Sequence, residues 1–171
     1  MSSKPRAFNP AAPTGNMIRD SALGLVPETL EPYMALNLLV WKAGPLTAAE
    51  IEVARLRNAR TVNCVFCRNV RYDIAKDAGL DEAQVAMIDD DYAGSDLGER
   101  EKLIIAFVDQ YYGNPAGMAD DLKLRLQMAF SAQELAHLSL AIAHFSGFSR
   151  CAVALGGMPD GMPVMAISLP A

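Results

Sequence analysis

Apolar residues recur along the chain at intervals of three and four, the spacing of amphipathic helices, and no stretch alternates convincingly as a strand would. Glycine, proline and asparagine or aspartate clusters separate the periodic stretches. The pattern predicts helices over about 27–43, 47–60, 64–78, 81–88, 99–112, 119–129 and 131–155. We therefore predict an all-α fold, a single-domain helical bundle of about six to seven helices.

Several helix starts have recognisable signals. Thr47 with Glu50, and Ser131 with Glu134, have the spacing of capping boxes, in which a hydroxyl and a carboxylate satisfy each other's backbone N–H groups. Asn63 is a good N-cap for the helix that follows the β-branched pair at 61–62. The helix over 131–155 is apolar nearly all round, which is typical of an element buried in a bundle or an assembly.

The two ends of the chain differ from the helical part. Residues 1–16 contain three prolines and few large apolar groups, so we predict an extended, flexible arm. Residues 158–171 contain three further prolines and are predicted to form an irregular tail. Because this tail is rich in Met, Val, Ile and Leu, we expect it to pack on its own or a neighbouring subunit.

Composition narrows the class of protein. A chain of 171 residues fits one domain (1–171) with a sizeable core, and its net charge of -5 gives no support for binding nucleic acid or an anionic membrane. The first residues lack the apolar core of a signal peptide, and no uncharged apolar run is long enough to span a bilayer. Three cysteines do not form a secreted disulfide framework, so we expect a cytoplasmic protein.

The segment that suggests chemistry is Cys64-x-x-Cys67, at the start of the predicted third helix. A helix N-terminus favours the thiolate, which is the nucleophilic form of cysteine. Arg71 follows at helical spacing, and a helical hairpin bent near residue 62 would place Glu52 opposite it. The sequence thus predicts a cluster of Cys64, Cys67, Arg71 and Glu52.

Each of these residues also has a simpler interpretation. The two cysteines could be small buried residues or, with His137 and His144, zinc ligands, although nothing in the sequence brings that helix to the thiols. Glu52 could pair locally with Arg55, three residues on, as a solvated ion pair. Arg71 could merely pin two helices, and the histidines could be core or interface residues.

Cys151 and the acidic segment 89–98 are two further candidates for a chemical role. Cys151 lies in the apolar last helix and is interpreted as a core residue. The acidic segment 89–98 resembles a calcium loop only in part, because Arg100 occupies the position where the loop needs a glutamate. We expect no metal and no cofactor.

Glu52, the Cys-x-x-Cys twelve residues later, the run GPLTAAEIEVARLRNARTVNCVFC and the later AIAHFSGFSRCAVALGG resemble the carboxymuconolactone decarboxylase superfamily, specifically its AhpD-like alkylhydroperoxidase branch. The resemblance covers roughly residues 25–157. It implies an all-helical AhpD-like fold assembled as a trimer or hexamer. It also implies that Cys67 attacks a peroxide, that Cys64 resolves the product, and that Glu52 belongs to a proton relay.

The relay of that family uses a histidine four residues after the second cysteine, where this chain has Arg71. Arginine stays protonated and cannot shuttle protons. We therefore expect a thiol-dependent peroxidase, weakened by about 10²–10⁴-fold if proton transfer is lost. The resemblance implies a small hydroperoxide substrate and a lipoylated or thioredoxin-like protein as reductant. The alternatives are a lactone decarboxylase of the same superfamily, in which the Cys-x-x-Cys would be unnecessary, and a non-catalytic redox-sensing oligomer.

Overall fold

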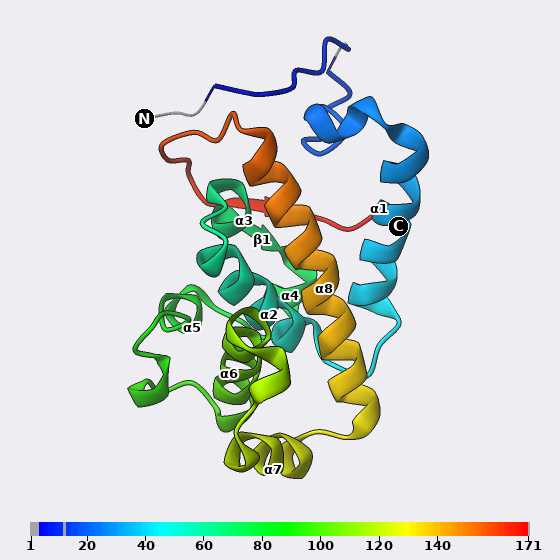
Figure 1. Ribbon diagram of the computed structural model, residues 1–171. Coiled ribbons are helices and arrows are strands. Elements are labelled where there is room, and N and C mark those ends of the chain that lie inside the picture. The colour runs from blue at the N-terminus through cyan, green and yellow to red at the C-terminus, as the bar shows by residue number, and fades with distance from the viewer. Residues whose placement is uncertain (1–3, 12, 171) are drawn as a thin grey trace.

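The structure is a computed structural model that describes residues 4–11 and 13–170. The described residues form eight α-helices and two short strands (Figure 1). In chain order these are α1 (Pro27–Lys42), α2 (Ala48–Thr61), α3 (Val65–Asn69), β1 (Val70–Tyr72), α4 (Asp73–Asp77), α5 (Glu82–Ala86), α6 (Glu99–Gly113), α7 (Asp120–Ala129), α8 (Ala132–Leu155) and β2 (Met165–Ile167). Short 3₁₀ turns lie at Ala22–Leu25, Tyr92–Gly94 and Pro115–Gly117. The predicted all-α class is confirmed.

Helix α2 is at the centre of the fold. It packs against α8 and α6, and also against α3 and α4 (Figure 1). Every residue from 51 to 59 is buried, including the charged side chains Glu52, Arg55 and Arg57. A helix enclosed on all sides can carry charges only if they are paired or hydrogen-bonded, and this requirement shapes the site described below.

The capping boxes predicted at Thr47–Glu50 and Ser131–Glu134 are both present. The structure adds a contact that connects them: the Arg100 guanidinium of α6 lies 2.7 Å from a carboxylate oxygen of each glutamate. Hydrogen bonds from Ser131 and the neighbouring Arg100 lower the pKa of Glu134 to about 2. One arginine thus joins the N-termini of the two helices that pack together in the core.

The predicted continuous helix over 64–78 is wrong. The chain leaves the helical conformation after Asn69, forms β1, and becomes helical again in α4. β1 pairs in parallel with β2 of the C-terminal tail, so that Val70 lies opposite Met165 and Tyr72 opposite Ile167. β-branched and aromatic side chains favour strands, and here a partner from the far end of the chain makes that preference decisive.

The C-terminal tail packs on its own chain, which is one of the two arrangements expected from the sequence. Figure 1 shows it passing beside β1 and ending near α1, where Lys42 Nζ donates to the Pro170 carbonyl at 3.0 Å. Cys151 is exposed, so its interpretation as a core residue is wrong. Within the described residues, α8 is the one helix long and apolar enough to cross a bilayer by length and composition, and 39% of its most apolar stretch is buried within the fold.

Candidate functional site

Cys64 and Cys67 are joined by a disulfide at the start of α3. The expected N-cap Asn63 instead adopts a left-handed conformation, with φ of 55°, and turns the chain so that Cys64 takes the N-cap position. Asparagine is one of the few non-glycine residues that adopt this conformation readily. Cys64 is fully buried, whereas Cys67 is partly exposed, so the two sulfurs differ in their access to reactants.

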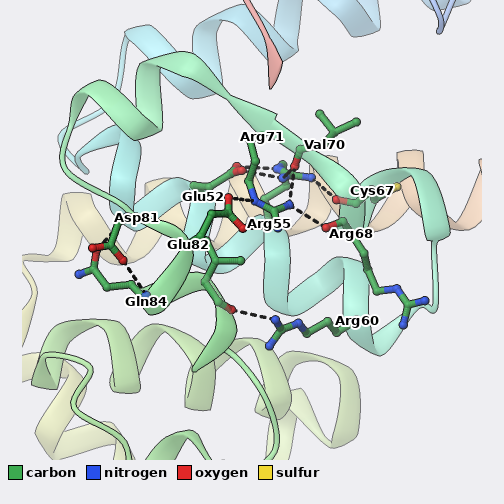
Figure 2. Close-up of polar contacts among 11 residues, drawn as sticks. Glu52, Arg55, Arg60, Cys67, Arg68, Val70, Arg71, Asp81, Glu82 and Gln84 are labelled. Atoms are coloured by element: carbon green, nitrogen blue, oxygen red, sulfur yellow. Dashed lines mark hydrogen bonds and ion pairs between the residues drawn. The ribbon is translucent and has the colours of Figure 1, made fainter. Parts of the chain in front are cut away.

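The buried ion pair of Glu52 and Arg55 holds the segment that carries Cys67. Arg55 Nε and Nη2 donate to the two carboxylate oxygens of Glu52, each at 2.6 Å. The same guanidinium donates to the carbonyls of Cys67 and Val70, both at 2.7 Å (Figure 2). Burial alone disfavours the charged guanidinium, but the facing carboxylate more than offsets this effect and raises the pKa of Arg55.

The predicted pairing of Glu52 with Arg71 is wrong. Arg71 donates to Glu82 at 2.8 and 3.1 Å and to the backbone carbonyls of Arg68 and Val70 (Figure 2). Side chains alternate along a strand, so the neighbours of Arg71 in β1 point to one side and Arg71 to the other. Glu52 has the local partner Arg55, as the simpler interpretation proposed, although the pair is buried and not solvated.

This geometry gives the first prediction. Replacing Arg71 with histidine is expected to leave the rate of disulfide formation from the reduced protein within about twofold of wild type. The new imidazole would occupy the side of β1 that faces Glu82, and loss of one partly exposed ion pair changes stability by up to about 1 kcal/mol. Thiol titration during oxidation measures the rate. A marked acceleration would show that position 71 does reach the thiols.

A cavity of about 440 Å³ opens beside Cys67. Val70 and Tyr72 of β1 line it, as do side chains from α1, α8, the segment 15–18 and the C-terminal tail. Among the described residues that line it, Arg55 is the one with a charged side chain, and Glu52 balances its charge. The remaining polar groups belong to neutral side chains such as Asn37, Tyr72 and Ser149, and burial raises the pKa of Tyr72, so its hydroxyl stays protonated.

His144 of α8 also lines this cavity. Its ring stacks on Tyr33 with centroids 4.4 Å apart and contacts the Phe145 ring edge-on. Nε2 lies 3.1 Å from Asn37 Oδ1, so Nε2 carries the proton and Nδ1 the lone pair. Within the described chain Nδ1 has no hydrogen-bond partner, and burial lowers the pKa of His144 to about 4. The cavity is therefore lined by a neutral imidazole whose Nδ1 is buried and has no hydrogen-bond partner within the described chain.

The zinc alternative receives no support from the described part of the chain, where no three His, Cys, Asp or Glu side chains come together as a metal site. His137 points elsewhere, with Nε2 2.9 Å from the Val40 carbonyl. From the sequence, His144 was expected to be a core or interface residue and Arg55 part of a solvated ion pair with Glu52; both side chains are buried. A histidine in an otherwise apolar helix, and an arginine three residues after Glu52, were the available signals.

These observations define a class: an all-helical protein with a Cys-x-x-Cys disulfide placed between a buried ion pair and an apolar cavity. Residues 27–108 match the model of the Carboxymuconolactone decarboxylase family. The resemblance to this family inferred from the motifs is therefore confirmed over residues 27–108, just under half of the chain. The match includes Glu52, Arg55 and both cysteines of the disulfide, but ends before α8 and the tail.

Two curated relatives are the uncharacterized protein MT2376 of Mycobacterium tuberculosis strain CDC 1551 and the uncharacterized protein Rv2313c of strain H37Rv. Each is 30% identical over 105 residues, which is 61% of this chain and 37% of the relative, so the alignment spans little more than a third of their length. A crystal structure of ATU0492 from Agrobacterium tumefaciens, a protein of unknown function proposed to be the antioxidant defence protein AhpD, is similar with a TM-score of 0.66. It is 24% identical, and the alignment covers 77% of this chain and 90% of that one, which confirms the predicted AhpD-like fold.

Proposed function

We propose that this protein is a thiol-dependent peroxidase that reduces small hydroperoxides with the Cys64–Cys67 pair. The observation that supports this function best is the asymmetry of the disulfide: Cys67 lines the cavity, whereas Cys64 is fully buried behind it. A peroxide that enters the cavity meets Cys67 first, and Cys64 is already within bonding distance to complete the reaction. The match of residues 27–108 to the family model and the AhpD-like fold agree with this proposal.

The reaction starts from the two thiols. The Cys67 thiolate attacks the outer oxygen of the hydroperoxide, so that an S–O bond forms, the O–O bond breaks and an alkoxide leaves. The alkoxide takes up one proton and departs as the alcohol. The Cys64 sulfur then displaces hydroxide from the Cys67 sulfenic acid, and that hydroxide leaves as water with the Cys64 proton. The two thiols lose two electrons, and the peroxide gains them.

We assign the proton transfer of the first step to His144, and not to Arg71. A neutral imidazole can accept the Cys67 proton and return it to the departing alkoxide, whereas a guanidinium cannot release one. Glu52 is given an indirect role, since both of its oxygens are bound to Arg55. Its contribution is to keep Arg55 charged and in place beneath Cys67.

The remaining parts of the proposal concern partners. A dithiol must reduce the disulfide in each cycle, and a lipoylated or thioredoxin-like protein fits that requirement chemically. We further propose a homo-oligomer, a trimer or hexamer, in the cytoplasm, where glutathione and thioredoxin keep such thiols reduced between turnovers.

The test uses the reduced protein and one equivalent of cumene hydroperoxide. We expect the loss of two thiols per chain and a Cys64–Cys67 disulfide in the peptide mass spectrum. Cys67→Ser should abolish the reaction, and Cys64→Ser should stop at a sulfenic acid that dimedone traps. Cys151→Ser is the matched control, because that exposed cysteine lies outside the site and its removal should change nothing. Wild-type protein that keeps both thiols under these conditions would refute the proposal.

A further inference from the structure

The cavity beside Cys67 owes much of its wall to parts of the chain that lie outside the family match. That match spans residues 27–108, whereas Met165, Ile167 and Leu169 come from the tail and Met17 and Ile18 from the N-terminal segment. The shared domain therefore supplies the disulfide, and the ends of this particular chain supply the surface that a reactant must pass.

We propose that the C-terminal segment 165–170 is a selectivity wall that admits neutral, apolar reactants to Cys67 and disfavours charged or strongly hydrated ones. This inference rests on the proposed function for the identity of the reactant. The placement of the wall rests on the contacts of the segment itself.

The segment is fastened along its length. Met165, Ala166 and Ile167 pair in register with β1, which begins three residues after Cys67. The Ser168 hydroxyl donates to Asp73 at the start of α4, and the Pro170 carbonyl accepts from Lys42 at the end of α1. Contacts to three separate elements fix the segment across the cavity as part of its wall.

The segment lines the cavity along most of its length. Met165, Ile167 and Leu169 contribute apolar side chains to the cavity, and Ser168 and Pro170 line it as well, whereas Ala166 does not. Ile167 and Leu169 also pack against the core. Val164, one position before the strand, lies outside the lining and is 53% exposed. Ile167 is thus a position in the cavity, and Val164, three residues earlier, is a position on the surface.

The chemistry of the wall determines what it favours. Phe66 and Phe148 face the same space as the three tail side chains, and the charged Arg55 is already neutralised by Glu52. A charged reactant that enters must lose hydration without gaining an unpaired charge as partner, which costs free energy. An alkyl or aryl hydroperoxide keeps its apolar body against the wall, and its polar head can reach Asn37 and His144.

The first experiment tests the wall without requiring peroxidase activity. Reduced proteins in a Cys151→Ser background are treated with a cationic or an anionic methanethiosulfonate reagent, in which the Cys67 sulfur displaces a sulfinate and forms a mixed disulfide. Ile167→Glu should raise the cation-to-anion rate ratio roughly tenfold and Ile167→Lys should lower it by a similar factor, as expected for one charge a few ångströms from the path. Val164→Glu and Val164→Lys should leave it nearly unchanged. Unfolding cannot move the cation-to-anion rate ratio in opposite directions in the Glu and Lys variants. Equal ratios in all four variants would therefore refute the proposed role of the segment 165–170.

The second experiment links the wall to the substrate. Wild type should form its disulfide faster with cumene hydroperoxide than with hydrogen peroxide, and Ile167→Glu should reduce that preference by roughly tenfold, the scale of one or two methylene groups in an apolar pocket. If wild type reacts with neither peroxide while the ion ratios still shift, the proposed function fails and the wall stands. If wild type reacts but Ile167→Glu keeps its preference, the selectivity role fails and the peroxidase stands.

Discussion

Replacing His144 with glutamine is expected to slow peroxide-driven formation of the Cys64–Cys67 disulfide by roughly 100-fold or more, the usual contribution of a positioned acid–base group. Glutamine keeps a hydrogen bond to Asn37 but cannot bind a proton. The measurement is the second-order rate with cumene hydroperoxide from about pH 3 to pH 8, a range that passes through the pKa of His144. Since burial lowers the pKa of His144 to about 4, the basic form predominates above pH 5. The wild-type rate should therefore lose a contribution as the pH falls through that pKa, and the glutamine variant should lack this limb.

The chain offers a matched control for that prediction. His137 lies on the same helix seven residues earlier, bonds to the Val40 carbonyl and does not line the cavity. His137→Gln should keep the wild-type rate. In His144→Ala, added imidazole should restore part of the rate, whereas thiophene, of similar size but without a basic nitrogen, should not. Wild-type rates in His144→Gln, or equal help from both molecules, would remove His144 from the proposed mechanism.

The parts of the fold that depend on neighbours in sequence could be predicted. The capping boxes at Thr47 and Ser131 are present, and the α6 helix begins at Glu99 as the pattern indicated. These signals are local, because a hydroxyl three residues before a carboxylate can satisfy a helix end without help from elsewhere. The family resemblance could also be predicted, because it depends on the spacing between Glu52 and the Cys-x-x-Cys, which is visible in the sequence.

The parts that failed depend on distant partners. The segment 70–72 leaves the helix because β2, almost a hundred residues later, pairs with it, and nothing in the segment alone announces that partner. This one change turns Arg71 away from Glu52 and places Val70 and Tyr72 against the cavity. Regular helical spacing through residue 71 would have placed Arg71 opposite Glu52, whereas in the structure Glu52 pairs with Arg55 and Arg71 with Glu82. His144 could not be assigned to the site from the sequence either, because it comes from α8, far along the chain from the cysteines.

The buried ion pair gives the prediction with the largest effect on stability. Arg55→Met should destabilise the fold by about 3–5 kcal/mol, because Glu52, 1% exposed, would be left as an uncompensated buried charge. At the same time the carbonyls of Cys67 and Val70 would each lose the hydrogen bond from Arg55, and Val70 would keep only the one from Arg71. Urea unfolding of the oxidised protein measures the loss. Amide hydrogen exchange should also show faster opening around residues 67–70.

A double substitution separates the two causes of that loss. If the unpaired carboxylate dominates, Glu52→Gln combined with Arg55→Met should recover much of the stability, because the neutral pair leaves no buried charge. The recovered protein should still exchange rapidly around residues 67–70, since only Arg55 ties those carbonyls to α2. Arg57→Met is the control: this arginine of the same helix pairs with Asp109 and Asp90, away from the disulfide. A double variant as unstable as Arg55→Met alone would show that the bonds to the backbone carbonyls, and not the ion pair, hold this region together.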